Sequence, residues 1–90
     1  MTHQYGLIGY PLSHSFSPGY FNEKFKVLGI DAEYAAYPIQ QIEDFPLLIQ
    51  KQKFDGMNVT IPYKEAIMRF LDEIDVEAAI IGAVNTIQFT

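Results

Sequence analysis

The stretch Tyr5-Gly-Leu-Ile-Gly-Tyr-Pro-Leu-Ser-His-Ser-Phe-Ser-Pro18 decides the fold class, because it places a strand and a helix in succession. Its first part, up to Gly9, is short, apolar and closed by glycine, which is typical of a buried strand. Ser17 and Pro18 favour a helix start, since a hydroxyl suits the N-cap and proline suits the first helical position. The stretch therefore predicts a strand–loop–helix unit.

The same alternation continues along the rest of the chain. Further strands are expected at 32–39, 54–61 and 83–90, and helices after Asp44, Pro62 and Asp75. The first helix should end at Gly29, with Phe21, Phe25 and Leu28 on its buried face. The order β-α-β-α-β-α-α-β predicts one α/β domain over residues 1–90, with an open, mostly parallel, twisted sheet flanked by helices.

Composition narrows the function classes. Hydrophobic residues make up 49% and charged residues 19% of the 90, which indicates a globular chain. A net charge of −5 with six basic residues argues against nucleic-acid binding. With no cysteine and two histidines, neither a disulfide nor a metal site is expected. No apolar run approaches the roughly 18 residues of a membrane span, and no signal peptide is recognisable, so we expect a cytoplasmic protein.

Three polar groups are expected at the edge of the sheet where ligands of open α/β folds bind. They are residues 13–17, then Asn58, Thr60 and Lys64, and finally Asn85 with Thr86. Ser15 and Ser17 suit a small carboxylate, because their hydroxyls and the free N–H groups of the following helix are all donors. The alternative is that Ser17 is only an N-cap and Ser15 only a turn residue.

Lys64 is the strongest catalytic candidate. Two residues after Pro62 it should lie in the first turn of a helix, where the helix dipole opposes a cation. That field and partial burial would lower the pKa of a catalytic lysine towards the working pH. The alternative is a solvated lysine paired with Asp55 or Glu65. Asn58 and Asn85 are unusual within strands, so their amides either tie loops together or meet a polar ligand.

Taken together, three blocks resemble the signature blocks of the shikimate dehydrogenase family. They are Gly9-Tyr-Pro-Leu-Ser-His-Ser-Phe-Ser-Pro18, Gly56-Met-Asn-Val-Thr-Ile-Pro-Tyr-Lys64 and Gly82-Ala-Val-Asn-Thr86, in matching order and separation. The resemblance implies the substrate domain of a two-domain dehydrogenase that reduces 3-dehydroshikimate to shikimate with NADPH, in aromatic amino-acid biosynthesis. It implies that Ser15, Ser17 and Thr60 bind the carboxylate, that Lys64 is the catalytic lysine, and that Asn85 holds ring hydroxyls, with Asn58 among the residues around the substrate.

The chain departs from the family pattern by stopping early. The family's catalytic aspartate, its NADP-binding domain and its carboxy-terminal segment are absent from this chain, so the 90 residues alone should be inactive. No glycine spacing fits a dinucleotide or phosphate loop. Two other functions stay open, a non-catalytic shikimate- or quinate-binding regulatory module and a quinate/shikimate dehydrogenase. An unrelated flavodoxin-like scaffold would leave the three blocks as coincidence.

Overall fold

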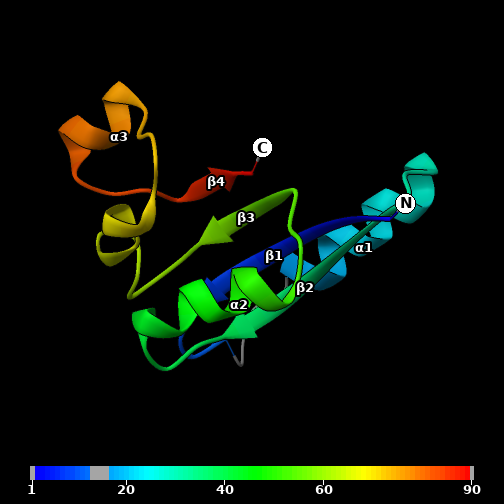
Figure 1. Ribbon diagram of the computed structural model, residues 1–90. Coiled ribbons are helices and arrows are strands. Elements are labelled where there is room, and N and C mark those ends of the chain that lie inside the picture. Colours follow the sequence, from blue (N-terminus) through cyan, green and yellow to red (C-terminus); the bar gives the residue numbers. More distant parts are fainter. Residues whose placement is uncertain (1, 13–16, 90) are drawn as a thin grey trace.

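A computed structural model describes residues 2–12 and 17–89 and contains a four-stranded sheet (Figure 1). The strands are β1 (His3–Gly9), β2 (Ala32–Pro38), β3 (Gly56–Val59) and β4 (Thr86–Gln88), arranged in the order β2-β1-β3-β4. β1 pairs in parallel with β2 and with β3, whereas β4 runs antiparallel to β3. The predicted open, mostly parallel α/β sheet is confirmed.

Three α-helices and two 3₁₀ helices connect the strands. They are α1 (Ser17–Leu28), η1 (Ile42–Asp44), α2 (Phe45–Lys51), η2 (Ala66–Phe70) and α3 (Val76–Ile81). The predicted helix starts at Ser17, Asp44 and Asp75 are confirmed, and so are the glycine ends, with Gly29 at φ 69° and Gly82 at φ 82°. No helix in the part of the chain that the structure describes is long and apolar enough to cross a membrane.

The prediction of an α-helix opening at Pro62 is wrong. The chain makes turns after β3, and regular winding begins only at Ala66, as a 3₁₀ helix. The Tyr63 hydroxyl donates to the Ile39 carbonyl at 2.6 Å, and Ile67 is fully buried. Tyr63 is thus tied to the residue after β2, and the segment that follows winds as a short 3₁₀ helix that buries Ile67.

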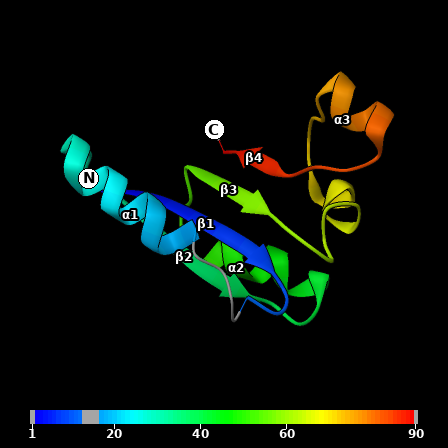
Figure 2. The same ribbon diagram turned by 180° about the vertical axis from the view of Figure 1, so that it is seen from behind.

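The helices cover opposite faces of the sheet, α2 on one and α1 on the other (Figures 1 and 2). Because side chains alternate along a strand, each strand serves both faces. The α2 face carries the apolar core, which joins side chains of β1, β3 and β4 to α2 and η2; its members are Ile8, Ile42, Phe45, Phe54, Met57, Val59, Tyr63, Ile67, Val84 and Ile87.

The α1 face is covered over β1 and β2. The rings of Phe25 and Phe21 pack on Tyr5 and Tyr34, with centroids 5.8 and 4.8 Å apart. Leu28, predicted to face inward, is 60% exposed, because the last turn of α1 extends beyond the sheet (Figure 2). Over β3 and β4 the same face stays accessible, and this opening positions the candidate site.

Candidate functional site

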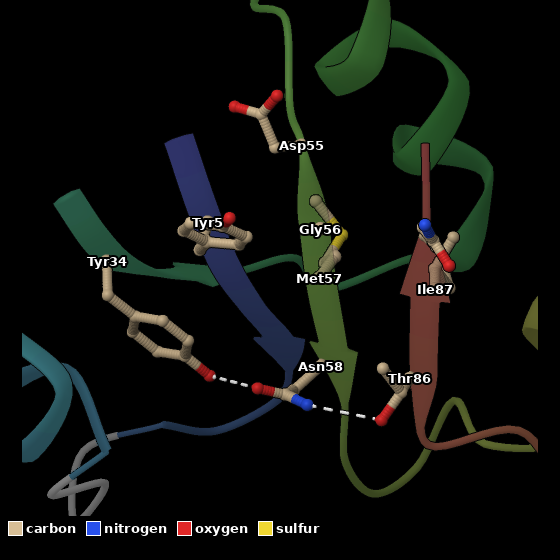
Figure 3. Close-up of a pocket in the computed structure, with 9 residues that line it drawn as sticks. Tyr5, Tyr34, Asp55, Gly56, Met57, Asn58, Thr86 and Ile87 are labelled. Atoms are coloured by element: carbon tan, nitrogen blue, oxygen red, sulfur yellow. Dashed lines mark hydrogen bonds between the residues drawn. The ribbon is translucent and has the colours of Figure 1, made fainter. Parts of the chain in front are cut away.

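A pocket of about 360 Å³ lies over β3 and β4 on the α1 face, and we call it the β3–β4 pocket (Figure 3). Residues from all four strands line it. Its lining comprises Tyr5, Tyr34, Asp55, Gly56, Met57, Asn58, Thr86, Ile87 and Gln88. Of the residues predicted to bind substrate, Asn58 lines this pocket.

A chain of hydrogen bonds runs across the pocket. The Tyr34 hydroxyl donates to Asn58 Oδ1 at 2.8 Å, and Asn58 Nδ2 donates to Thr86 Oγ1 at 3.4 Å (Figure 3). The Thr86 hydroxyl in turn donates to Asn85 Oδ1 at 3.2 Å. The structure therefore brings Asn58 and Asn85 into one polar network, although 27 positions separate them in the sequence.

Strand direction explains why these residues meet. β1 and β3 are parallel and end at the same edge of the sheet, and antiparallel β4 begins at that edge. Asn85 precedes β4, and its carbonyl accepts a hydrogen bond from the Val59 N–H at 2.9 Å. Thr60 follows β3, and its N–H donates to the Ile8 carbonyl at 2.9 Å. Asn58, Thr60 and Asn85 thus lie at one edge, as their positions predicted.

The segment that carries Lys64 is attached to the same edge. The Lys64 carbonyl accepts a hydrogen bond of 2.8 Å from the Val84 N–H, one residue before Asn85. Lys64 is partly exposed and lies in a turn, so the predicted helix dipole does not act on it. Within residues 2–12 and 17–89 the ion pairs join His3 to Asp55 and Arg69 to Glu43, and neither Asp55 nor Glu65 pairs with Lys64.

Two of the three predicted carboxylate-binding residues, Ser15 and Ser17, cannot be placed from the described residues. This applies to all of Ser15 and to the side chain of Ser17, whose backbone begins α1. The end of α1 lies near the start of β1, because the His3 N–H donates to the Asp31 carbonyl at 3.0 Å. The start of the helix is therefore directed to the opposite edge, where β1 and β3 end. That Ser15 and Ser17 face Lys64 stays a prediction.

Close packing accounts for the glycine at the end of β1. A Cβ built at Gly9 would collide with the Thr60 methyl group and approach the Ile61 carbonyl to 3.0 Å. Gly9 thus allows the turn after β3 to pack against β1. The described residues also contain no group of three or more His, Cys, Asp or Glu side chains that could hold a metal ion.

Two ionisable groups at the pocket have shifted pKa values. Burial raises the pKa of Tyr34 to about 12, so its hydroxyl stays a donor over a wide pH range. The Gln4 N–H, which donates to the Asp55 carboxylate at 2.9 Å, holds the pKa of that group below its ordinary value, and His3 acts in the same direction. Tyr34 was not predicted at this site, because it fits a strand for local reasons alone, whereas Thr86 was placed in the third polar group without a role of its own.

Comparison with known proteins identifies the family of this chain. Residues 7–87 match the family model described as the shikimate dehydrogenase substrate binding domain. The chain is 49% identical over 89 residues to the shikimate dehydrogenase (NADP(+)) of Shouchella clausii. The alignment covers 97% of this chain and 32% of that relative. The chain is 42% identical to the shikimate dehydrogenase (NADP(+)) of Bacillus subtilis, and that alignment covers 98% of this chain and 32% of the relative. The chain thus spans about a third of the length of these relatives.

Solved structures agree with the sequence relatives. One is shikimate dehydrogenase from Thermus thermophilus in complex with shikimate, with TM-score 0.89, 33% identity, and coverage of 99% of this chain and 35% of that one. Another is a shikimate dehydrogenase in complex with NADP+, with TM-score 0.86, 47% identity, and coverage of 97% and 31%.

Proposed function

This chain belongs to the family of shikimate dehydrogenase substrate-binding domains, and on that premise we propose that it binds the substrate of an NADP-dependent shikimate dehydrogenase. The protein interconverts 3-dehydroshikimate and shikimate on the route to aromatic amino acids. We assign residues 1–90 to one domain and the binding of the dinucleotide to a second domain. We assign the reaction to the cytoplasm, where reduced dinucleotide serves biosynthesis.

One observation carries the proposal, namely the shared edge of the sheet. Asn58 and Asn85 belong to one hydrogen-bond chain, and the Lys64 carbonyl is bonded to the residue before Asn85. In the proposed complex the asparagine amides bind the ring hydroxyls, Thr60 contributes to carboxylate binding, and Lys64 exchanges a proton with the reacting ring oxygen. Ser15 and Ser17 supply the remaining carboxylate donors.

The test is an assay of the protein expressed from its complete coding sequence. We expect NADP+-dependent oxidation of shikimate, and Lys64→Ala should lower turnover at least about 100-fold with little change in KM, because general acid–base catalysis contributes that much. Lys51→Ala, at the exposed end of α2, is the matched control and should retain activity. Near-normal turnover of Lys64→Ala would remove the lysine from catalysis.

The same preparation separates the alternative functions. Shikimate binding without turnover in the complete protein would favour the regulatory module. Comparable kcat/KM for quinate and shikimate would favour a quinate/shikimate dehydrogenase. The 90-residue chain alone should bind shikimate weakly and not turn it over, since the domain that closes the cleft would be missing. Amide shifts on titration should include Thr60 and Asn85, and shifts confined to distant residues would contradict the pocket.

A further inference from the structure

Tyr34, in the edge strand β2, is held from three directions. Asn22 of α1 makes two hydrogen bonds with its backbone, because Asn22 Nδ2 donates to the Tyr34 carbonyl at 2.7 Å and the Tyr34 N–H donates to Asn22 Oδ1 at 2.8 Å. The Phe21 ring stacks on the tyrosine ring with an interplanar angle of 28°. The third attachment is the hydroxyl bond to Asn58.

The hydroxyl of Tyr34 determines how the Asn58 amide is turned. Tyr34 is only 6% exposed, so its O–H needs an acceptor within the protein. Asn58 Oδ1 supplies that acceptor, and turning the amide over would present N–H groups to the hydroxyl instead. The favoured orientation therefore leaves Asn58 Nδ2 on the side of Thr86 and the β3–β4 pocket (Figure 3).

The direction set at Tyr34 continues to Asn85. Thr86 has one hydroxyl hydrogen, and since its oxygen already accepts from Asn58, that hydrogen is free to bond Asn85 Oδ1. Each group in the chain donates to the next, so the amide oxygens of Asn58 and Asn85 are both engaged. Their remaining N–H groups are left as hydrogen-bond donors at the ligand edge.

We propose that Tyr34 is a positioning residue whose hydroxyl, acting through Asn58 and Thr86, orients both asparagine amides as donors towards a polyhydroxylated ligand. The identity of that ligand as shikimate rests on the proposed function. Tyr34 itself acts through Asn58 and is not a catalytic residue. The high pKa of the buried phenol keeps this arrangement independent of pH under ordinary conditions.

Tyr34→Phe in the complete protein is the direct test. It keeps the ring on Phe21 and the backbone bonds to Asn22, and it removes only the hydroxyl. We expect KM for shikimate to rise about three- to tenfold, the range for loss of one neutral hydrogen bond, with kcat within about twofold. Tyr37→Phe is the matched control, since its hydroxyl accepts from Gln52 away from the pocket and KM should not change. An unchanged KM in Tyr34→Phe would overturn the proposal.

A second pair of variants tests the middle of the hydrogen-bond chain, at Thr86, and does not disturb the buried tyrosine. Thr86 is exposed, so replacing it should leave folding intact. Thr86→Val keeps the branched shape and loses the hydroxyl, and it should raise KM about as much as Tyr34→Phe. Thr86→Ser keeps the hydroxyl and should behave like the wild type. Equal KM values for the valine and serine variants would show that the hydrogen-bond chain does not determine the affinity for shikimate.

A spectroscopic measurement separates this inference from the proposed function. The side-chain amide resonances of Asn58 and Asn85 should both shift in Tyr34→Phe and stay in place in Tyr37→Phe, with no ligand present. If the wild-type protein failed to oxidise shikimate, the proposed function would fall, but coupled shifts would still support the orienting role of Tyr34. Unmoved Asn85 signals would refute that role whatever the substrate.

Discussion

The two faces of the sheet differ in what their side chains do. On the α2 face, residues such as Ile8, Phe45 and Ile67 are almost completely buried in one apolar cluster. On the α1 face, the large apolar side chains that are buried among those described are Leu7 and Tyr34, and neighbouring positions line the β3–β4 pocket. One sheet thus separates the apolar core from the proposed ligand site, since alternate residues of the same strand face different sides.

β3 shows the separation most clearly. Met57 and Val59 are buried in the core, while Asn58 between them joins the hydrogen-bond chain to Tyr34 and Thr86. A polar residue is tolerated there because α1 covers β1 and β2 and leaves this face open over β3. The difference between the faces suggests substitutions that should affect folding on one side and binding on the other.

The largest expected effect is on the α2 face. Phe45 is 1% exposed and packs against Phe70, so Phe45→Ala should lower the free energy of unfolding by about 3–5 kcal/mol through lost burial and a cavity. Thr86→Ala on the exposed part of the α1 face should cost less than about 1 kcal/mol. Urea denaturation measures both, and a similar cost for the two would contradict the contrast between the faces.

Tyr34 gives the α1 face one stability effect that depends on pH. Below pH 10.0 the phenol is protonated in the folded and the unfolded chain, so the free energy of unfolding does not depend on it. Between this value and about 12 only the unfolded chain loses the proton, so stability should fall as pH rises, by about 2–3 kcal/mol.

Urea denaturation at a series of alkaline pH values measures this loss. Tyr34→Phe should lose correspondingly less stability over the same window. A residual loss is expected in that variant, because burial, followed by the nearby Asp44 and Glu43, also raises the pKa of Tyr63. Identical alkaline profiles for the wild type and Tyr34→Phe would show that the buried phenol is not the group that titrates.

Local chemistry made much of this fold predictable. Ser17-Pro18 and Gly29 bound α1 through cap preferences, and Gly82 ends α3, because these signals act within one turn of chain. The polar residues of the site could be predicted from their places just inside or beyond strand ends.

Features that depend on tertiary contacts could not be predicted. The winding after Pro62 depends on Tyr63 reaching Ile39, 24 residues away. The role of Tyr34 depends on Asn22 and on Asn58, and nothing in its own segment distinguishes it from Tyr37, the next tyrosine. Local patterns are silent on such pairings, because the partners meet only once the sheet has formed.

Gly6 tests how closely the α2 face is packed. A Cβ built at Gly6 would lie 2.9 Å from the Tyr37 ring and 3.4 Å from Phe54. Those two rings pack edge to face, and Gln52 donates to the Tyr37 hydroxyl, so the tyrosine has little freedom to move. Gly6→Ala should therefore cost about 1–3 kcal/mol of stability, measured by urea denaturation. A neutral result would show that the core can rearrange.

Gly56→Ala is the matched substitution on the α1 face, and its expected effect is the smallest. The added Cβ would approach the Tyr5 ring to 3.0 Å, nearly the contact found at Gly6. Tyr5, however, lines the β3–β4 pocket, so its ring can move into open space. The remaining strain should be offset by the smaller conformational entropy of the unfolded chain, worth about 0.4–1 kcal/mol, so stability should change by less than about 0.5 kcal/mol. The two added Cβ atoms make similar contacts, so any difference in stability between the variants must come from their surroundings. An equal loss of stability in Gly6→Ala and Gly56→Ala would mean that the α1 face is as rigid as the core.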